Sequence, residues 1–253
     1  MKRLRILSLL AVVIMIVSCS ASAMPIFDRH GHVIVLTYHK ISEKPSEWSD
    51  YCIPPKMFED DIKYLAAQGY SFVTASELAT VDKDKKTAVI TFDDGYESDL
   101  KYAAPVLQKY GAKASFFIIG SAVGTDEYMT AEQIAALAKM PCAEIGNHSY
   151  KTHFKNYGTL TVMYKNAMYE KELLADFAEN DAFIKKIIGK APVALTYPNG
   201  IFSENIDKKL HDGGKLVTFS TLEKTFCGIK SGVPVGRRNR SYYRNIADIV
   251  KRR

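Results

Sequence analysis

The stretch Ala88-Val89-Ile90-Thr91-Phe92-Asp93-Asp94-Gly95-Tyr96 begins as an apolar run and ends in two adjacent carboxylates and a glycine. The run is typical of a buried β-strand. Neighbouring side chains of a strand point to opposite faces, so Asp93 and Asp94 reach one site only if the chain turns between them. Gly95 gives the backbone the freedom to turn. The stretch therefore predicts a strand whose end carries two carboxylates with different roles.

Two histidines follow another strand-like segment, in Glu144-Ile145-Gly146-Asn147-His148-Ser149-Tyr150-Lys151-Thr152-His153. Two imidazoles and one carboxylate are typical of catalytic rather than structural zinc, because they leave coordination positions open for water. A bound divalent ion lowers the pKa of its water from about 15.7 to about 7. This segment and the Asp-Asp pair together indicate a hydrolytic metal site.

Each motif by itself has a simpler explanation. Asp-Asp-Gly is most often only a turn. A spacing of five between histidines suits neither one face of a helix nor one face of a strand, so both rings meet one ion only on an irregular loop. A third motif at a strand end, Leu195-Thr196-Tyr197-Pro198-Asn199-Gly200, favours the functional interpretation.

These motifs resemble the first three motifs of the polysaccharide deacetylases, carbohydrate esterase family 4. The matching segments are Thr91 to Tyr96, His148 to His153 and Thr196 to Gly200. The resemblance covers roughly Val33 to Val235 and implies an α/β fold, a distorted and incomplete (β/α) barrel. It also implies a base and three ligands for one divalent metal ion, expected to be Zn²⁺. The base would be Asp93, and the ligands would be Asp94, His148 and His153.

The resemblance implies further roles around the metal. The backbone N–H of Tyr197 would help to hold the developing oxyanion, and Tyr96 and Pro198 would line the substrate site. Aromatic faces stack on sugar rings, so Trp48 and Tyr51, on the loop before the first predicted helix, are further candidates for substrate binding. The alternative is that Trp48 only pins its loop.

The chain departs from the family pattern at several points. Its histidines are five apart, as in the branch resembling exported poly-N-acetylglucosamine deacetylases. No arginine precedes Tyr197 to orient the base, so we expect Lys40, Arg237 or Arg238 to supply this cation. The late Leu-x-His motif is also missing, and His39 is the candidate general acid, because an imidazole can protonate a leaving amine near neutral pH.

The expected function is a metal-dependent hydrolase that removes N-acetyl groups from an extracellular or cell-wall N-acetylhexosamine polysaccharide. An O-acetyl esterase acting on xylan-type sugars is an alternative with the same chemistry. A non-catalytic carbohydrate-binding protein that retains the fold is a second alternative, suggested by the missing arginine and the altered histidine spacing. The intact base and metal ligands argue against it.

The N-terminus predicts an export signal over residues 1–23, with a basic start and an apolar run from Ile6 to Val17. Ala21-Ser22-Ala23 is one cleavage site. Ile16-Val17-Ser18-Cys19 resembles a lipobox, and it is slightly favoured because the apolar run ends there. We therefore expect a cell-envelope lipoprotein, or a secreted or periplasmic protein. Membrane contact would come only through the lipid anchor, and residues 24–253 would form a single catalytic domain.

The composition fits one compact domain and a sugar-polymer substrate. Three of the 34 basic residues lie in the signal, and the remaining 31 exceed the 28 acidic residues by only three. This balance does not indicate nucleic-acid binding, and we expect a monomer. Cys52, Cys142 and Cys227 are expected to be small buried apolar residues, with one disulfide as the alternative.

Strands and helices alternate along the chain, as in a parallel sheet. In an α/β barrel all the motifs above would meet at the carboxyl ends of the strands. Strands are predicted at 32–38, 71–73, 114–119, 193–196 and 215–219, in addition to the strands that lead into Asp93 and into His148. Helices are predicted at 54–69, 76–78, 100–110, 130–140, 161–188 with a break near Asn180, and 203–211. The helix at 130–140 is expected to begin with Thr130 as a capping residue, supported by the acidic Glu132.

Overall fold

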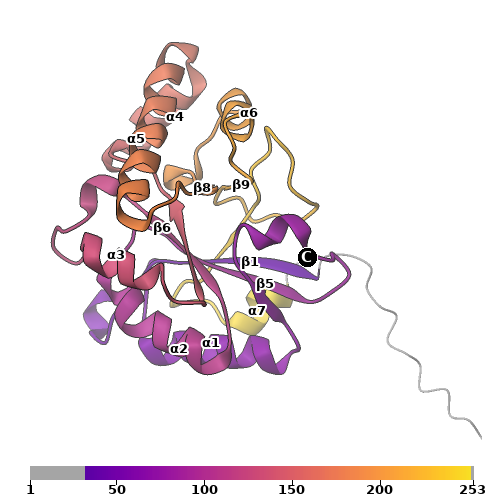
Figure 1. The fold of residues 1–253 in the computed structure, drawn as a ribbon. Coiled ribbons are helices and arrows are strands. Elements are labelled where there is room, and N and C mark those ends of the chain that lie inside the picture. Colours follow the sequence, from indigo (N-terminus) through magenta and orange to yellow (C-terminus); the bar gives the residue numbers. More distant parts are fainter. Residues whose placement is uncertain (1–31, 252–253) are drawn as a thin grey trace, which may run out of the picture.

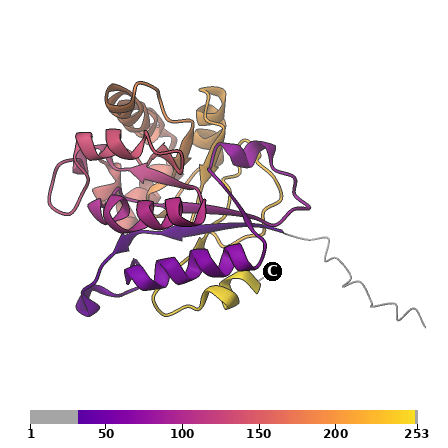
Figure 2. The same ribbon diagram turned by 60° about the horizontal axis from the view of Figure 1, so that its bottom comes forward.

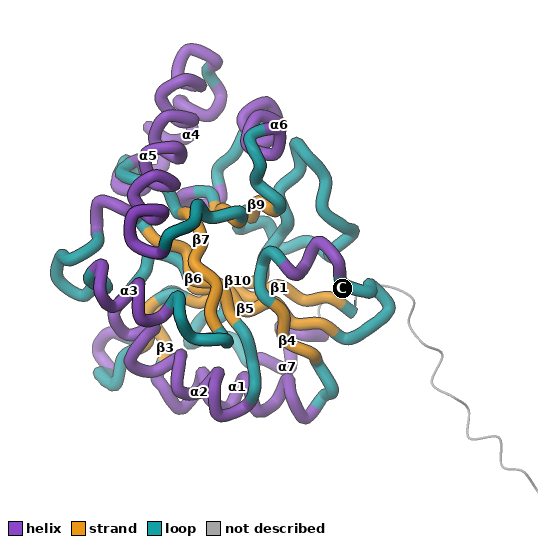
Figure 3. The backbone as a smooth tube through the Cα atoms, in the orientation of Figure 1, coloured by secondary structure: helices purple, strands orange, loops and turns teal. Residues whose placement is uncertain are grey.

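The structure is a computed structural model that describes residues 32–251. Its main sheet has eight strands, all of them paired in parallel, in the order β10-β1-β5-β6-β7-β8-β9, with β4 beside the first half of β5 (Figure 3). The strands are β1 (Val33–Tyr38), β4 (Ser71–Val73), β5 (Thr87–Phe92), β6 (Ala114–Ile118), β7 (Ala143–Asn147), β8 (Ala194–Thr196), β9 (Val217–Phe219) and β10 (Arg238–Asn239). A two-stranded ribbon pairs β2 (Lys40–Ile41) with β3 (Cys52–Ile53).

Helices cover the outside of the curled sheet (Figure 1). Figure 2 shows α1 and α7 together along one side of the sheet. The helices are α1 (Pro55–Ala67), α2 (Ala104–Tyr110), α3 (Ala131–Leu137), α4 (Tyr157–Lys165), α5 (Glu170–Ile188), α6 (Glu204–Asp212) and α7 (Ile246–Lys251). A π-type turn, Asp99–Ala103, leads into α2.

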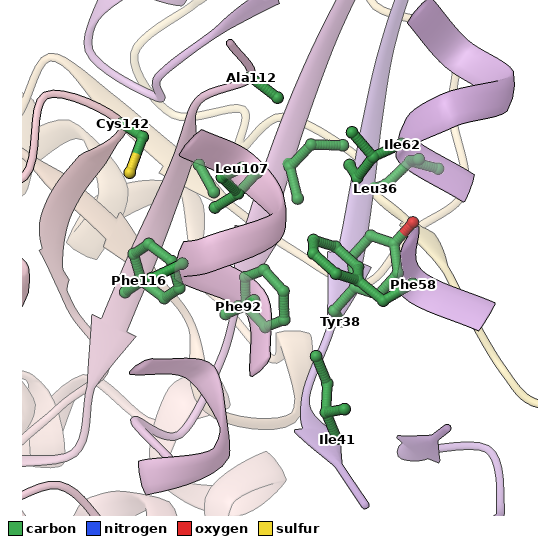
Figure 4. Close-up of a cluster of buried hydrophobic side chains, with 14 of the residues drawn as sticks. Leu36, Tyr38, Ile41, Phe58, Ile62, Phe92, Leu107, Ala112, Phe116 and Cys142 are labelled. Carbon is green, nitrogen blue, oxygen red and sulfur yellow. The ribbon is translucent and has the colours of Figure 1, made fainter. Parts of the chain in front are cut away.

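Alternation along the strands decides which side chains enter the barrel. Val33, Val35 and Val89 pack against residues of β8 and β9 on the inner face. On the opposite face of the same two strands, Leu36 and Phe92 point outward. They pack with helix residues such as Phe58, Ile62 and Leu107 (Figure 4). Because side chains alternate, Thr91 and Asp93 continue the inner row that Val89 begins. The hydrophobic pattern of β5 thus places Asp93 inside the barrel.

The barrel closes through a segment near the C-terminus. Val235 bridges to Phe219 of β9, and three residues later Arg238 pairs with Leu36 of β1. The first and last strands of the described chain therefore lie side by side, while a single bridge connects the closing segment to β9. This arrangement confirms the predicted distorted, incomplete (β/α) barrel.

Most predicted elements are present, but the long helix breaks in a different place. The chain leaves helical geometry at Asn166 (φ −117°, ψ 116°), whose side chain accepts a hydrogen bond from the N–H of Met168. Asn180, where the break was predicted, lies inside α5. Its amide donates to Ile118 O and Asn147 Oδ1, so this polar residue serves a tertiary contact rather than a helix end.

Two smaller predictions are also settled. The predicted cap at Thr130 is confirmed as a reciprocal pair with Gln133, although α3 ends at Leu137, earlier than predicted. All three described cysteines are free; Cys52 and Cys142 are buried as predicted, whereas Cys227 is exposed.

The predicted export signal lies outside the described residues. Within residues 32–251, no helix has the length and apolar character needed to cross a membrane.

Candidate metal-centred active site

The predicted site residues lie where strands of the barrel end. His39 follows β1, Asp93 and Asp94 follow β5, and His148 follows β7. They line one cleft of about 460 Å³, together with His153 from the loop after β7. The carboxyl ends of parallel strands meet at one rim, which explains how residues more than 100 positions apart come together.

Three side chains form a candidate set of metal ligands. One ligand atom each from Asp94, His148 and His153 lies within 4.8 Å of the others. The Nε2 atoms of His148 and His153 are 3.4 Å and 3.3 Å from Asp94 Oδ1. Among the described residues this buried oxygen has no hydrogen-bond partner. A buried carboxylate oxygen facing two imidazole nitrogens fits a divalent cation, which would neutralise its charge.

The first histidine is held by the neighbouring strand. His148 Nδ1 lies 2.9 Å from the carbonyl oxygen of Thr196 and 2.5 Å from its hydroxyl oxygen. When Nδ1 carries the proton and donates to this carbonyl, Nε2 keeps a lone pair directed at Asp94. Ligand histidines commonly have their second nitrogen bound in this way.

The five-residue spacing is accommodated by an irregular loop. Ser149 has a left-handed backbone (φ 71°), and a short 3-10 turn spans Thr152–Phe154. The Ser149 hydroxyl accepts the N–H of His153 at 3.1 Å. The second ring thereby returns to the first, with the two ring centroids 4.7 Å apart.

Arg237 is the cation beside the candidate base. Its Nη1 and Nη2 donate to Asp93 Oδ1 and Oδ2 at 2.7 Å and 2.6 Å, and its side chain is fully buried. Burial by itself raises the pKa of Asp93, but the charges of Arg237 and His148 outweigh it and hold this pKa well below its usual range. The other candidates are engaged elsewhere: Lys40 pairs with Glu47 and Glu127, and Arg238 binds backbone carbonyls of α7.

His39 lies on the wall of the same cleft. Burial lowers its pKa from the ordinary value, and the charges of Asp94 and Asp93 oppose this effect only in part. Its Nδ1 is buried and has no partner among the described residues, and its ring centroid is 5.0 Å from that of Tyr51. Burial therefore favours the neutral form of this imidazole.

Tyr197 lines the cleft, and its backbone N–H is engaged by the neighbouring strand. This N–H, one residue beyond the end of β8, donates to the carbonyl of Phe219 in β9 at 3.0 Å, and its expected role at the oxyanion stays a prediction. The ring is buried, and its hydroxyl donates to Asp207 at 2.8 Å. Pro198 is buried and does not line the cleft, whereas Asn199, with a left-handed φ of 52°, does.

Of the three aromatic side chains predicted to bind substrate, Tyr96 and Tyr51 lie at the cleft and Trp48 does not. Tyr96 lines the cleft and stacks on Tyr128. Trp48 does not line it: its Nε1 donates to Ser42 O, and its ring packs against Tyr242, which agrees with the loop-pinning alternative. Tyr51, the second aromatic candidate on the same loop, does line the cleft. The sequence analysis assigned no cleft role to several further lining residues, which are Thr37, Tyr157, Asn199, Thr221 and Asn239.

Comparisons with known proteins agree with this geometry. Residues 80–216 match the family model described as polysaccharide deacetylase. The chain is 30% identical over 192 residues to YxkH of Bacillus subtilis, which is named as a polysaccharide deacetylase. The match covers 74% of this chain and 63% of YxkH, so the chain spans less than two thirds of the length of that relative. It is 23% identical over 215 residues to a poly-β-1,6-N-acetyl-D-glucosamine N-deacetylase of Staphylococcus aureus, covering 78% and 74% of the two chains. The structure of IcaB from Ammonifex degensii matches with a TM-score of 0.68 and 26% identity, over 82% of this chain and 91% of that one.

Proposed function

Because the chain belongs to the polysaccharide deacetylase family, we propose that it is a metal-dependent N-deacetylase of an extracellular or cell-wall N-acetylhexosamine polysaccharide. The observation that carries this proposal is the convergence of three metal-ligand atoms beside a carboxylate that an arginine keeps ionised. The named activity of the Staphylococcus aureus relative supports the amide as the substrate.

Asp94, His148 and His153 would hold the metal ion, which we expect to be Zn²⁺. When bound, the ion supplies an acidified water at neutral pH and positive charge for the developing oxyanion. The two histidines and one carboxylate are the donor set expected of a catalytic site with open positions.

Asp93 is proposed as the general base. The bidentate contact with Arg237 keeps its carboxylate ionised, so it can accept a proton from the attacking water near neutral pH. The contact also fixes the direction of the carboxylate, because both of its oxygens are bound. Arg237 fills the place of the missing motif arginine, which removes one reason for the carbohydrate-binding alternative.

His39 is proposed to protonate the departing amine. It reaches the cleft from β1, whereas the two metal-binding histidines belong to the loop after β7. A lowered pKa makes its imidazolium form a stronger acid but reduces the fraction that is protonated at neutral pH. We therefore expect catalysis to weaken as the pH rises above the pKa of His39.

Residues 1–23 are proposed to export the chain, with lipidation at Cys19 or cleavage after Ala23 as the two outcomes, and residues 24–253 to form the catalytic domain. The mass of the mature N-terminal peptide distinguishes them, because a diacylated cysteine adds a large and defined mass. An N-terminus that retains Met1 would contradict both.

The function is tested by acetate release from N-acetylglucosamine oligomers. The mature protein is stripped of metal and resupplied with Zn²⁺, with Asp93→Asn and the exposed control Asp84→Asn in parallel. We expect metal-restored release that Asp93→Asn abolishes and Asp84→Asn retains. Release only from acetylated xylan would identify the O-acetyl esterase. Stoichiometric metal binding without release from any acetylated polymer would favour the carbohydrate-binding protein.

A further inference from the structure

A carboxylate outside the three motifs holds the loop between the two histidines. Asp176 lies in α5 and is only 3% exposed. It accepts the backbone N–H groups of Tyr150 at 2.9 Å, Lys151 at 3.0 Å and Thr152 at 3.2 Å, and the Thr152 hydroxyl at 2.8 Å. Hydrogen bonds to an ionised acceptor are roughly twice as strong as neutral ones. Four of them on one carboxylate fix three consecutive peptide units.

These peptide units lead directly into the second histidine. His148 is held by Thr196 and is almost fully buried, whereas the side chain of His153 is 22% exposed. The path from Ser149 to His153 contains a left-handed residue and no regular secondary structure before the 3-10 turn. An irregular backbone keeps one conformation only when its surroundings determine it. For this loop, Asp176 provides four of the determining contacts.

The same face of α5 also fixes the start of the loop. Asn180, one turn after Asp176, donates to Asn147 Oδ1 at 2.9 Å. That oxygen accepts the N–H of Ser149 at 2.8 Å. Residues four apart lie on one face of a helix. This face of α5 therefore bonds residues 150–152 directly through Asp176 and reaches Ser149 through Asn147. The helix acts as a rigid template for an otherwise irregular loop.

We propose that Asp176 is a positioning residue that sets the place of His153 in the metal site and thereby the affinity for the metal. This inference rests on the proposed metal-dependent function, because it assumes that His153 is a ligand. Asp176 itself does not line the cleft and does not touch the ligand atoms, so its effect passes through the backbone of residues 150–152.

The variant Asp176→Asn tests this role with little change in volume. An amide has one acceptor oxygen, and its NH₂ group faces donors that the carboxylate oxygen had satisfied. The matched control is Glu179→Gln, which makes the same charge change at an exposed position of the same helix. Zn²⁺ affinity is measured by competition with a chromophoric chelator, and ligand geometry by the visible spectrum of the Co²⁺-loaded protein.

We expect Asp176→Asn to lower Zn²⁺ affinity roughly 10–100-fold, the range found when groups that orient metal ligands are removed, and to change the Co²⁺ spectrum. Glu179→Gln should match the wild type in both measurements. If Asp176→Asn does not fold by circular dichroism, Thr152→Val removes one of the four contacts and should shift both readouts in the same direction by less. A folded Asp176→Asn, or in its place a folded Thr152→Val, with wild-type affinity and spectrum overturns the inference. If the wild type itself binds no Zn²⁺, the proposed function fails. If the wild type binds Zn²⁺ and the folded variant matches it, only the role given to Asp176 fails, so the two failures are distinguishable.

Discussion

The Asp93–Arg237 pair shows how the proposed catalytic base depends on a contact distant in the sequence. The guanidinium is anchored twice more, through Nε to Ser220 O and through Nη1 to the hydroxyl of Thr91. Its plane therefore has one orientation, and this orientation matches both carboxylate oxygens. A lysine offers a compact charge and no such planar fork, so the two cations are not interchangeable here.

Removing this guanidinium should leave the proposed base without its orienting contacts and move its titration. In Arg237→Met the burial of Asp93 is no longer opposed by Arg237, so its pKa rises and the acid limb of the pH profile of kcat/KM shifts to higher pH. We expect a loss of at least about 10²-fold near neutral pH, the lower end of the contribution of a general base.

The control is Arg237→Lys, which keeps the charge and should leave the acid limb closer to that of the wild type while losing the bidentate geometry. An Arg237→Met enzyme that is folded and has an unshifted acid limb would contradict the role given to Arg237.

The two ligand histidines should compete with protons differently. In the metal-free protein, burial lowers the pKa of His153 to about 4. Burial also opposes protonation of His148, but the charges of Asp93 and Asp94 outweigh it and raise this pKa above its ordinary value. Only His148 then loses a proton on metal binding between pH 5 and about 6.5. The logarithm of Zn²⁺ affinity should rise with a slope of about one per pH unit in this window. Chelator competition measures it, and a slope of two would show that both rings are protonated there.

At the scale of elements, the shortest strand of the main sheet has a large effect on the site. The two-residue strand β10 follows Arg237 directly and pairs with β1. Beyond it, Arg240 binds Asp61 of α1 through Nε at 2.6 Å and Nη2 at 3.0 Å, and Tyr38 of β1 donates to the same carboxylate at 3.1 Å. These buried contacts hold the closing segment against the first strand and the first helix.

Breaking this anchor should destabilise the whole fold. Arg240→Leu leaves Asp61, which is 1% exposed, without its cation. Removing one partner of a buried pair typically costs about 3–5 kcal/mol, and urea unfolding should show a loss of this size. The double variant Asp61→Asn/Arg240→Leu, which leaves no unpaired charge, should recover part of it. A loss below about 1 kcal/mol for Arg240→Leu would mean that the pair does not anchor the segment.

In the molecule as a whole, the curling of one parallel sheet brings the proposed metal ligands together. Asp94 follows a strand near the middle of the strand order, and His148 follows a strand two positions away. A bound ion would therefore connect β5 to the loop after β7, and it would bind the folded state more tightly than the unfolded chain. Metal binding and global stability are expected to be linked.

Zn²⁺ should raise the midpoint of thermal unfolding. At a free concentration of about 100 times Kd, binding to the folded state alone adds about 2.7 kcal/mol, which corresponds to a rise of roughly 5–10 °C for a domain of this size. Differential scanning calorimetry of the metal-stripped and resupplied protein measures this shift. Asp94→Asn should reduce the rise strongly, whereas the exposed control Asp84→Asn should keep it. An equal rise in Asp94→Asn would place the stabilising ion elsewhere.

Local sequence patterns predicted most of the strands and helices and marked the candidate site residues at their ends. Strand β5, the strand before Tyr197 and the capped helix at Thr130 follow from apolar periodicity and local capping, which depend only on neighbours along the chain. The same local information marked Asp93, Asp94, His148 and His153, because each lies at the end of a predicted strand or on the loop that follows. The helix break was predicted wrongly at Asn180 because this polar residue is satisfied by a distant strand end rather than by its own helix.

The contacts between groups far apart in the sequence follow from the fold as a whole. The fold selected Arg237 among three cations, assigned the Tyr197 N–H to the sheet, and placed Asp176 against the histidine loop. Arg237 lies 144 residues from Asp93 in the sequence, and no local pattern reports such a contact. Strand pairing and barrel closure bring such distant residues into contact. Both depend on the packing of the whole sheet rather than on the preference of any one segment.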